Sequence, residues 1–212
     1  MSRVRLAALA LACLLLAGCL SLAGPRDEVR VFSPETTVTP NPDWPQADWQ
    51  MMVMAVSANQ LLDSPRIAVR PVPNQLQTYR GVRWADNAPE LLETAVVEGF
   101  EDSGRIAAIG RMGNSARGDF ALFMEVRAFE TVYRDGQPEA VIEVQVNMIH
   151  LRAGRVASKR FRQVVPGAAE DIDSMVVAFG EAMSATATDV VGWALVEGNR
   201  ARAAIAAESA GK

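Results

Sequence analysis

The sequence predicts a single α/β (α+β) domain in which two main helices pack against a mixed, mostly antiparallel sheet. Three observations support this fold class. Apolar and polar residues alternate in successive stretches between residues 120 and 165, separated by short turn sequences, as in an antiparallel meander. Two stretches, 87–104 and 172–193, repeat apolar residues at steps of three and four, as amphipathic helices do. Half of the 212 residues are hydrophobic, which suffices for one core.

Residues 1–18 have the pattern of a lipoprotein signal peptide. Arg3 and Arg5 form a positive start, residues 6–16 are apolar, and small residues follow. The apolar run is too short to span a membrane comfortably as a permanent helix. We therefore expect export of the chain and removal of this segment.

Cys19 follows this leader directly and allows several interpretations. It could be an ordinary buried cysteine, or the leader could be a simple signal peptide that is cleaved nearby. The stretch 16–19, Leu-Ala-Gly-Cys, resembles the bacterial lipobox, which predicts cleavage between Gly18 and Cys19 and a diacylglyceryl group on the Cys19 sulfur. Because Cys13 would be removed with the leader, the mature chain could form no internal disulfide.

The next segment, 19–46, is expected to be the lipidated N-terminus and a proline-rich tether, since prolines recur through it. Within it, the alternation of residues 29–33 suggests a short strand. The folded domain is expected at 47–198, and an Ala-rich tail at 199–212. Residues 49–58 form a nearly unbroken apolar run, which predicts a strand buried on both faces.

The two helices and the meander follow from local patterns. Asn87 is expected to accept hydrogen bonds from the first turn of one helix, with Glu90 in capping-box position and Gly104 at its end. The meander contains alternating strands in 119–133 and 139–151, and a third strand after the turn at 152–155. A long second helix, whose apolar stripe runs from Ile172 to Trp193, is expected to lie on the sheet.

Composition and motifs favour a protein that is not an enzyme. Without residues 1–18 the chain carries 19 basic and 25 acidic side chains, a formal charge of −6, which disfavours nucleic acid as a partner. The single histidine, His150, has neither a zinc motif nor a nucleophile motif around it, and we expect it to be structural, with no metal or cofactor. An enzyme that used carboxylates alone, such as Glu125 with Glu143, remains an alternative.

A basic stretch in this acidic chain provides a candidate docking surface for an acidic partner or for phospholipid head groups. The alternative is that these side chains simply cover solvated strand faces. The residues are Arg152, Arg155, Lys159, Arg160 and Arg162.

The order of these features resembles the ABC-type transport auxiliary lipoproteins, the family of paraquat-inducible protein C. The resemblance covers Cys19 and about Val29 to Leu195. It depends most on the stretches 63–70 (DSPRIAVR), 84–86 (WAD) and 102–106 (DSGRI), and on Gly154 with Arg155. Val69 stands where the family often has an aromatic residue.

The resemblance implies an accessory function with no catalytic residues. Such a lipoprotein would dock the periplasmic mammalian-cell-entry (MCE) protein of an ABC transport system that moves phospholipids or other apolar molecules. It also leaves open a homo-oligomer. Leu20 after the cysteine, instead of Asp, suggests the periplasmic face of the outer membrane. A lipoprotein that itself binds and carries a lipid is the alternative function.

Overall fold

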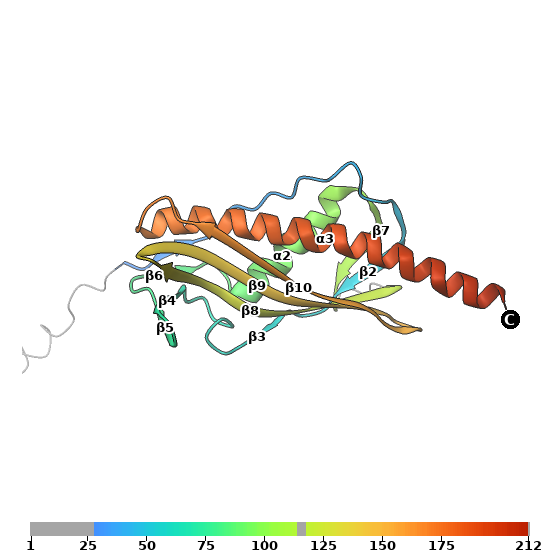
Figure 1. Ribbon diagram of the computed structural model, residues 1–212, viewed down its shortest axis with the longest axis horizontal. Coiled ribbons are helices and arrows are strands. Elements are labelled where there is room, and N and C mark those ends of the chain that lie inside the picture. Colours follow the sequence, from blue (N-terminus) through green and yellow to red (C-terminus); the bar gives the residue numbers. More distant parts are fainter. Residues whose placement is uncertain (1–27, 114–117, 212) are drawn as a thin grey trace, which may run out of the picture. The chain divides into compact units, whose positions relative to one another are not determined.

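Two helices pack against one face of a curled sheet in the computed structural model, which describes residues 28–113 and 118–211 without the side chain of Arg155 (Figure 1). The helices are α2 (Ala88–Ser103) and α3 (Ile172–Ala210). They belong to one unit, Val31–Lys212. The predicted single α/β domain with two main helices is confirmed.

Ten strands complete the described fold, eight of them in the main sheet and two, β1 and β6, in a small separate sheet. They are β1 (Arg30–Phe32), β2 (Ala47–Val53), β3 (Ser57–Ala58), β4 (Ala68–Val72), β5 (Gln75–Thr78), β6 (Val82–Trp84), β7 (Ile106–Arg111), β8 (Phe120–Arg134), β9 (Gln137–His150) and β10 (Gly154–Pro166).

The predicted meander is present, but the prediction of a mostly antiparallel sheet is wrong. Strands β8, β9 and β10 are antiparallel neighbours, and β4 and β5 form a second antiparallel pair. However, β8 also pairs in parallel with β2, β3 and β4, and β2 pairs in parallel with β7. In the described main sheet, four strand pairings are therefore parallel and three are antiparallel. Their partners lie far apart in the sequence, and the connection from β2 to β7 includes α2, as a parallel crossover requires.

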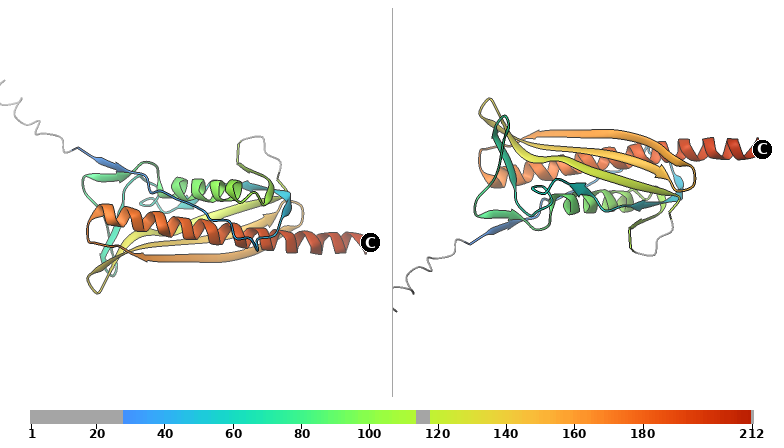
Figure 2. Two further views of the ribbon diagram at one scale, coloured as in Figure 1. Left: turned by 90° about the horizontal axis from the view of Figure 1, so that it is seen from above. Right: turned by 90° about the horizontal axis from the view of Figure 1, so that it is seen from below.

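The strand expected from residues 49–58 is shorter and is buried differently from the prediction. It forms β2, in which Ala47, Trp49, Met51 and Val53 are buried, whereas the residues between them are exposed or half-buried. Both helices lie on one side of the sheet, and the other side shows strands without a covering helix (Figure 2). One face of β2 therefore lacks the helical layer that burial on both faces needs.

The two helices bury the predicted apolar stripes, although their N-terminal caps differ. Asn87 precedes α2, but its side chain makes no cap hydrogen bond and instead donates to Asp63 at 3.2 Å, so the predicted capping box is wrong. Gly104 ends α2 in the left-handed region at φ +58°, as predicted. Helix α3 begins after Asp171, whose carboxylate accepts from the Ser174 amide at 2.8 Å.

The segment 31–46 lies along the helices, and its contacts depend on glycine. A Cβ atom on Gly180 of α3 would stand 2.5 Å from the carbonyl oxygen of Glu35. A Cβ atom on Gly99 of α2 would stand 2.8 Å from a methyl group of Val38, which is itself buried. The Thr37 amide also donates to the Ser184 hydroxyl at 3.0 Å. The folded unit therefore includes this segment, which we call the strap.

Aromatic side chains fill the core between α3 and the sheet. Trp84, Phe129 and Phe179 are essentially fully buried, and their ring centroids lie 5.0–5.8 Å apart. At the other end, Trp49 packs edge-on against Phe120 at 4.9 Å. Such dense aromatic packing holds the long α3 in a fixed position on the sheet.

Candidate functional site

The predicted lipidation site, Cys19 with Gly18 before the cleavage point, lies outside the described residues, so it remains a prediction. Within residues 28–113 and 118–211, no helix is both long enough and apolar enough to cross a membrane. The same residues contain no cluster of three or more His, Cys, Asp or Glu side chains that could hold a metal ion.

The sequence motifs behind the family resemblance join elements of the fold. Asp63 accepts the hydrogen bond from Asn87 at the start of α2. The Trp84 amide donates to the Pro65 carbonyl at 2.8 Å, which connects β6 to the loop before β4. Gly104, from the stretch 102–106, turns the chain from α2 into β7. In the described structure, these motifs position elements and do not converge on a chemical site.

The structure divides the predicted basic surface between the two faces of β10. On the open face, the Nε atoms of Arg160 and Arg162 lie 3.7 and 3.6 Å from the carboxylate oxygens of Glu143. On the helix face, the Lys159 ammonium lies 4.8 Å from the centre of the Phe161 ring. The two arginines are therefore neighbours, whereas Lys159 lies on the other side of the sheet.

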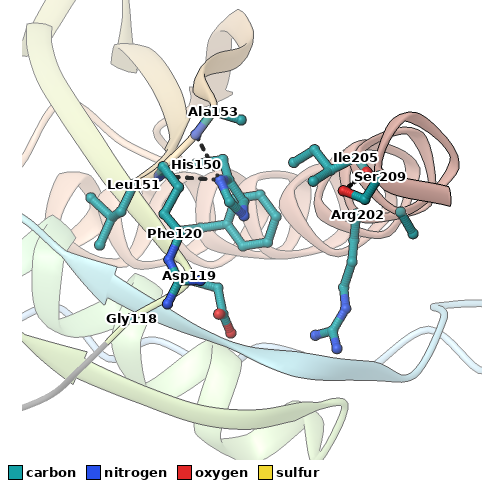
Figure 3. Close-up of a pocket in the computed structure, with 11 residues that line it drawn as sticks. Gly118, Asp119, Phe120, His150, Leu151, Ala153, Arg202, Ile205 and Ser209 are labelled. Atoms are coloured by element: carbon teal, nitrogen blue, oxygen red, sulfur yellow. Dashed lines mark hydrogen bonds between the residues drawn. The ribbon is translucent and has the colours of Figure 1, made fainter. Parts of the chain in front are cut away.

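The remaining members of the basic stretch belong to the turn between β9 and β10. Arg152 lines a cleft of about 530 Å³ that lies between this turn, the start of β8 and the last turns of α3 (Figure 3). Nothing is described for the Arg155 side chain. The four basic side chains that the structure describes, those of Arg152, Lys159, Arg160 and Arg162, thus do not form one patch.

His150 has a structural role in this cleft, in agreement with the prediction. Its Nδ1 atom accepts hydrogen bonds from the amides of Arg152 and Ala153, at 3.2 and 3.0 Å, which fixes the turn (Figure 3). Its ring also packs edge-on against Phe120 at 5.0 Å. Because Nδ1 accepts, the neutral ring carries its proton on Nε2.

Two charged residues of the same cleft were missed in the sequence analysis. The guanidinium of Arg202, on α3, binds the carboxylate and the carbonyl oxygen of Asp48, both at 3.2 Å. Asp119 accepts from the Gln50 amide at 3.0 Å. The Ser209 hydroxyl donates to a carbonyl of its own helix. These described groups bind other groups of the same chain and form no nucleophile–base pair. They were missed because they lie far apart in the sequence and belong to no motif.

The carboxylates considered for catalysis do not converge in a pocket. Glu125 is exposed on β8 and pairs with Arg127 at 3.4 Å. Glu143 lies on β9, where its carboxylate lies between Arg160 and Arg162. Each carboxylate therefore has its own cationic partners on the open face of the sheet, and the two are not held in a common pocket around one substrate.

Perturbed ionisable groups occur elsewhere, in the packing of β4 and β5 against β8. The guanidinium of Arg70 binds the buried carboxylate of Glu130 through two hydrogen bonds of 2.8 and 3.0 Å, and this pairing raises the pKa of Arg70. Burial raises the pKa of Tyr79 to about 12. Arg70 and Glu130 therefore hold β4 against β8, and the Tyr79 amide donates to the Ile67 carbonyl at 3.0 Å.

Known proteins resemble this chain in sequence and in fold. The family described as the ABC-type transport auxiliary lipoprotein component matches residues 31–191. The crystal structure of protein XCC0632 from Xanthomonas campestris is 41% identical, with a TM-score of 0.78 over 81% of this chain and 98% of that one. Protein CT253 of Chlamydia trachomatis shares the fold at 11% identity, with a TM-score of 0.50 over 71% of this chain and 96% of that one.

A curated relative is longer than the matched region. The uncharacterized protein bll6063 of Bradyrhizobium diazoefficiens is 24% identical over 146 residues, which are 66% of this chain but only 38% of that protein. The family match covers most of the folded unit, and the resemblance predicted from the motifs is confirmed. The chain belongs to the family of ABC-type transport auxiliary lipoproteins.

Proposed function

We propose that this auxiliary lipoprotein docks the periplasmic MCE-domain protein of its ABC transport system at the outer membrane, for the movement of phospholipids or other apolar molecules. The main support is that the family match begins at residue 31, shortly after the lipobox cysteine. A lipid on Cys19 would hold the folded unit at a membrane through residues 20–30. Leu20 favours the outer membrane.

The dimensions of the fold suit a bridging function. Phe32 lies beside Asp173 and Val177 in the first turns of α3, so the chain that follows Cys19 enters the folded unit at this end of the helix. Residues 20–30 can reach roughly 40 Å when extended. Helix α3 has 39 residues and therefore spans about 58 Å. Its C-terminal end, with the His150 cleft, is the end directed away from the strap's first residues (Figure 1).

A lipid-carrying function has less support. The space between α3 and the sheet is filled by buried side chains such as Trp84, Phe129 and Phe179. The cleft at His150 has charged groups in its lining and opens to solvent. An acyl chain needs a deeper apolar site. We therefore favour docking over carriage.

Crosslinking in intact cell envelopes tests the docking proposal. Cells that express the lipoprotein and its transport system are crosslinked, and the lipoprotein is purified under denaturing conditions. We expect an MCE-domain protein among the crosslinked products. Its absence, with both proteins present in the envelope, would refute the docking proposal and leave the family assignment unaffected.

A further inference from the structure

The outer edge of β10 carries a row of backbone groups without a partner strand in the described chain. The register between β9 and β10 is uninterrupted from Ala157 to Pro166. At its end the Gly167 amide donates to the Pro138 carbonyl at 2.9 Å, so odd-numbered residues of this part bond to β9. In an antiparallel pair the intervening residues direct N–H and C=O outward. These are Ser158, Arg160, Arg162 and Val164. Pro166, which has no N–H, also lies at an outward-facing position, where prolines are found in edge strands.

The charges on this edge discourage pairing with a second copy and favour an acidic partner. Arg160 and Arg162 share the one carboxylate of Glu143, and their side chains are 57% and 46% exposed. These two guanidinium groups thus share a single carboxylate, whereas Lys159, on the opposite face, lines a cavity together with Asp189. Basic side chains on an edge repel the same edge of another copy.

A cavity lies next to this edge on the helix side. It has a volume of about 370 Å³, and Lys159 of β10 forms part of its wall. The other walls include Trp44 of the strap and Trp193 and Val196 of α3. In a strand added to a sheet, alternate side chains point to opposite faces. A partner strand could thus present acidic side chains to Arg160 and Arg162 and an apolar side chain to this cavity.

We propose that the edge of β10 binds an extended, acidic segment of a partner polypeptide as an added strand, with an apolar side chain of that segment in the Trp44–Trp193 cavity. Main-chain hydrogen bonds to the outward groups would supply affinity, and the arginines and the cavity would supply specificity. This proposal rests on the proposed docking function in one respect: we expect the acidic segment to belong to a protein of the transport system.

A synthetic peptide and hydrogen exchange test the edge directly. The probe is a peptide of about ten residues, which matches the length of the free edge of β10. Glu and Leu alternate along it, and one Leu is replaced by Trp. The control is the same peptide with alternate backbone amides methylated. With the full-length lipoprotein in detergent, we expect exchange at Ser158, Arg160, Arg162 and Val164 to slow at least about tenfold with the probe alone. Protection elsewhere, or none, would overturn the proposal.

Substitution at Val164 provides a matched pair of variants. Val164→Pro removes an outward N–H while the ladder to β9 stays intact, and should weaken probe binding at least about tenfold. Val164→Thr keeps the N–H and the branched shape, and should bind within about twofold of the parent. Equal binding by both variants would contradict edge pairing. If Val164→Pro fails to fold, Arg160→Gln with Arg162→Gln should weaken binding and reduce its salt dependence.

The same variants separate this proposal from the proposed function. If Val164→Pro still captures the MCE-domain protein at the parent yield, the edge proposal fails and docking stands. If the parent captures no MCE-domain protein but binds the probe at β10, docking fails and the edge proposal stands. If the lipoprotein forms a dimer in which the same four amides are protected from exchange, the edge of β10 pairs with a second copy of the chain. That result would overturn the proposal of an acidic partner.

Discussion

Arg70 and Glu130 form the most buried ion pair among the described residues, and they join β4 to β8. The Glu130 side chain is 9% exposed and that of Arg70 32%. Arg70→Ala would leave the carboxylate buried without its cation, and should lower the free energy of unfolding by about 2–3 kcal/mol, less than for a fully buried pair. Urea denaturation measures this. Arg66→Ala, at an exposed position, should stay within about 0.5 kcal/mol, and equal losses in the two variants would contradict the account.

Tyr79 should make stability depend on alkaline pH. Its pKa is raised from 10.0 to about 12, chiefly by burial, and its hydroxyl has no hydrogen-bond partner of good geometry in the described chain. The folded state thus holds this proton more tightly than the unfolded state, so the contribution is complete below pH 10 and is lost as pH rises toward 12. We expect Tyr79→Phe to reduce the loss of stability between pH 9 and pH 11, measured by thermal unfolding. If Tyr79→Phe leaves the pH dependence of stability unchanged, burial does not raise the pKa of the Tyr79 hydroxyl as proposed.

At the scale of elements, the strap and α3 pack together because α3 has glycine at the contacts. Gly180→Ala would place a methyl group against the backbone of Glu35, which cannot turn aside. The expected cost of overpacking, about 1–3 kcal/mol, exceeds the gain of up to about 1 kcal/mol in helix propensity. We expect lower stability and faster hydrogen exchange in residues 31–46.

Gly192→Ala is the matched control for this contact. Its new methyl group would meet the side chain of Trp44, which is half-buried and can rotate away. The loss of stability should therefore be smaller than for Gly180→Ala. A larger loss would mean that the strap is held at Trp44 and not at Glu35.

Local patterns predicted the elements better than the connections between them. Alternation identified β8, β9 and β10, and the repeat of apolar residues identified α2 and α3, because these elements bury one face each. The parallel pairing of β2, β3 and β4 with β8 left no local signal, since it depends on partners distant in sequence. Likewise, Arg202 and Asp119 meet in one cleft only through the fold.

At the scale of the whole molecule, the candidate sites differ in what a sequence can reveal about them. The residues of the predicted lipobox are contiguous, so Cys19 could be proposed as a lipidation site from the sequence alone. The basic stretch could also be recognised in the sequence. However, alternate residues of β10 face opposite sides of the sheet, so Lys159 lies on one face and Arg160 and Arg162 lie on the other. The free edge of β10 needs the sheet order, which the sequence does not state.

The lipid anchor should control where the molecule resides. Cys19→Ala removes the thiol on which the lipobox interpretation places the diacylglyceryl group, so that interpretation predicts loss of fatty-acid labelling and of membrane fractionation. Cys13→Ala, within the expected leader, is the control and should be labelled like the parent. Labelling that persists in Cys19→Ala would contradict the lipobox interpretation.

The distribution of the MCE-domain protein between separated inner and outer membranes tests the central claim most directly. In cells with the parent lipoprotein, we expect part of the MCE-domain protein to sediment with the outer membrane. In cells with Cys19→Ala, expressed at the same level, this part should return to the inner-membrane fraction. If the distribution is the same in both strains, the lipoprotein does not dock its transporter at the outer membrane.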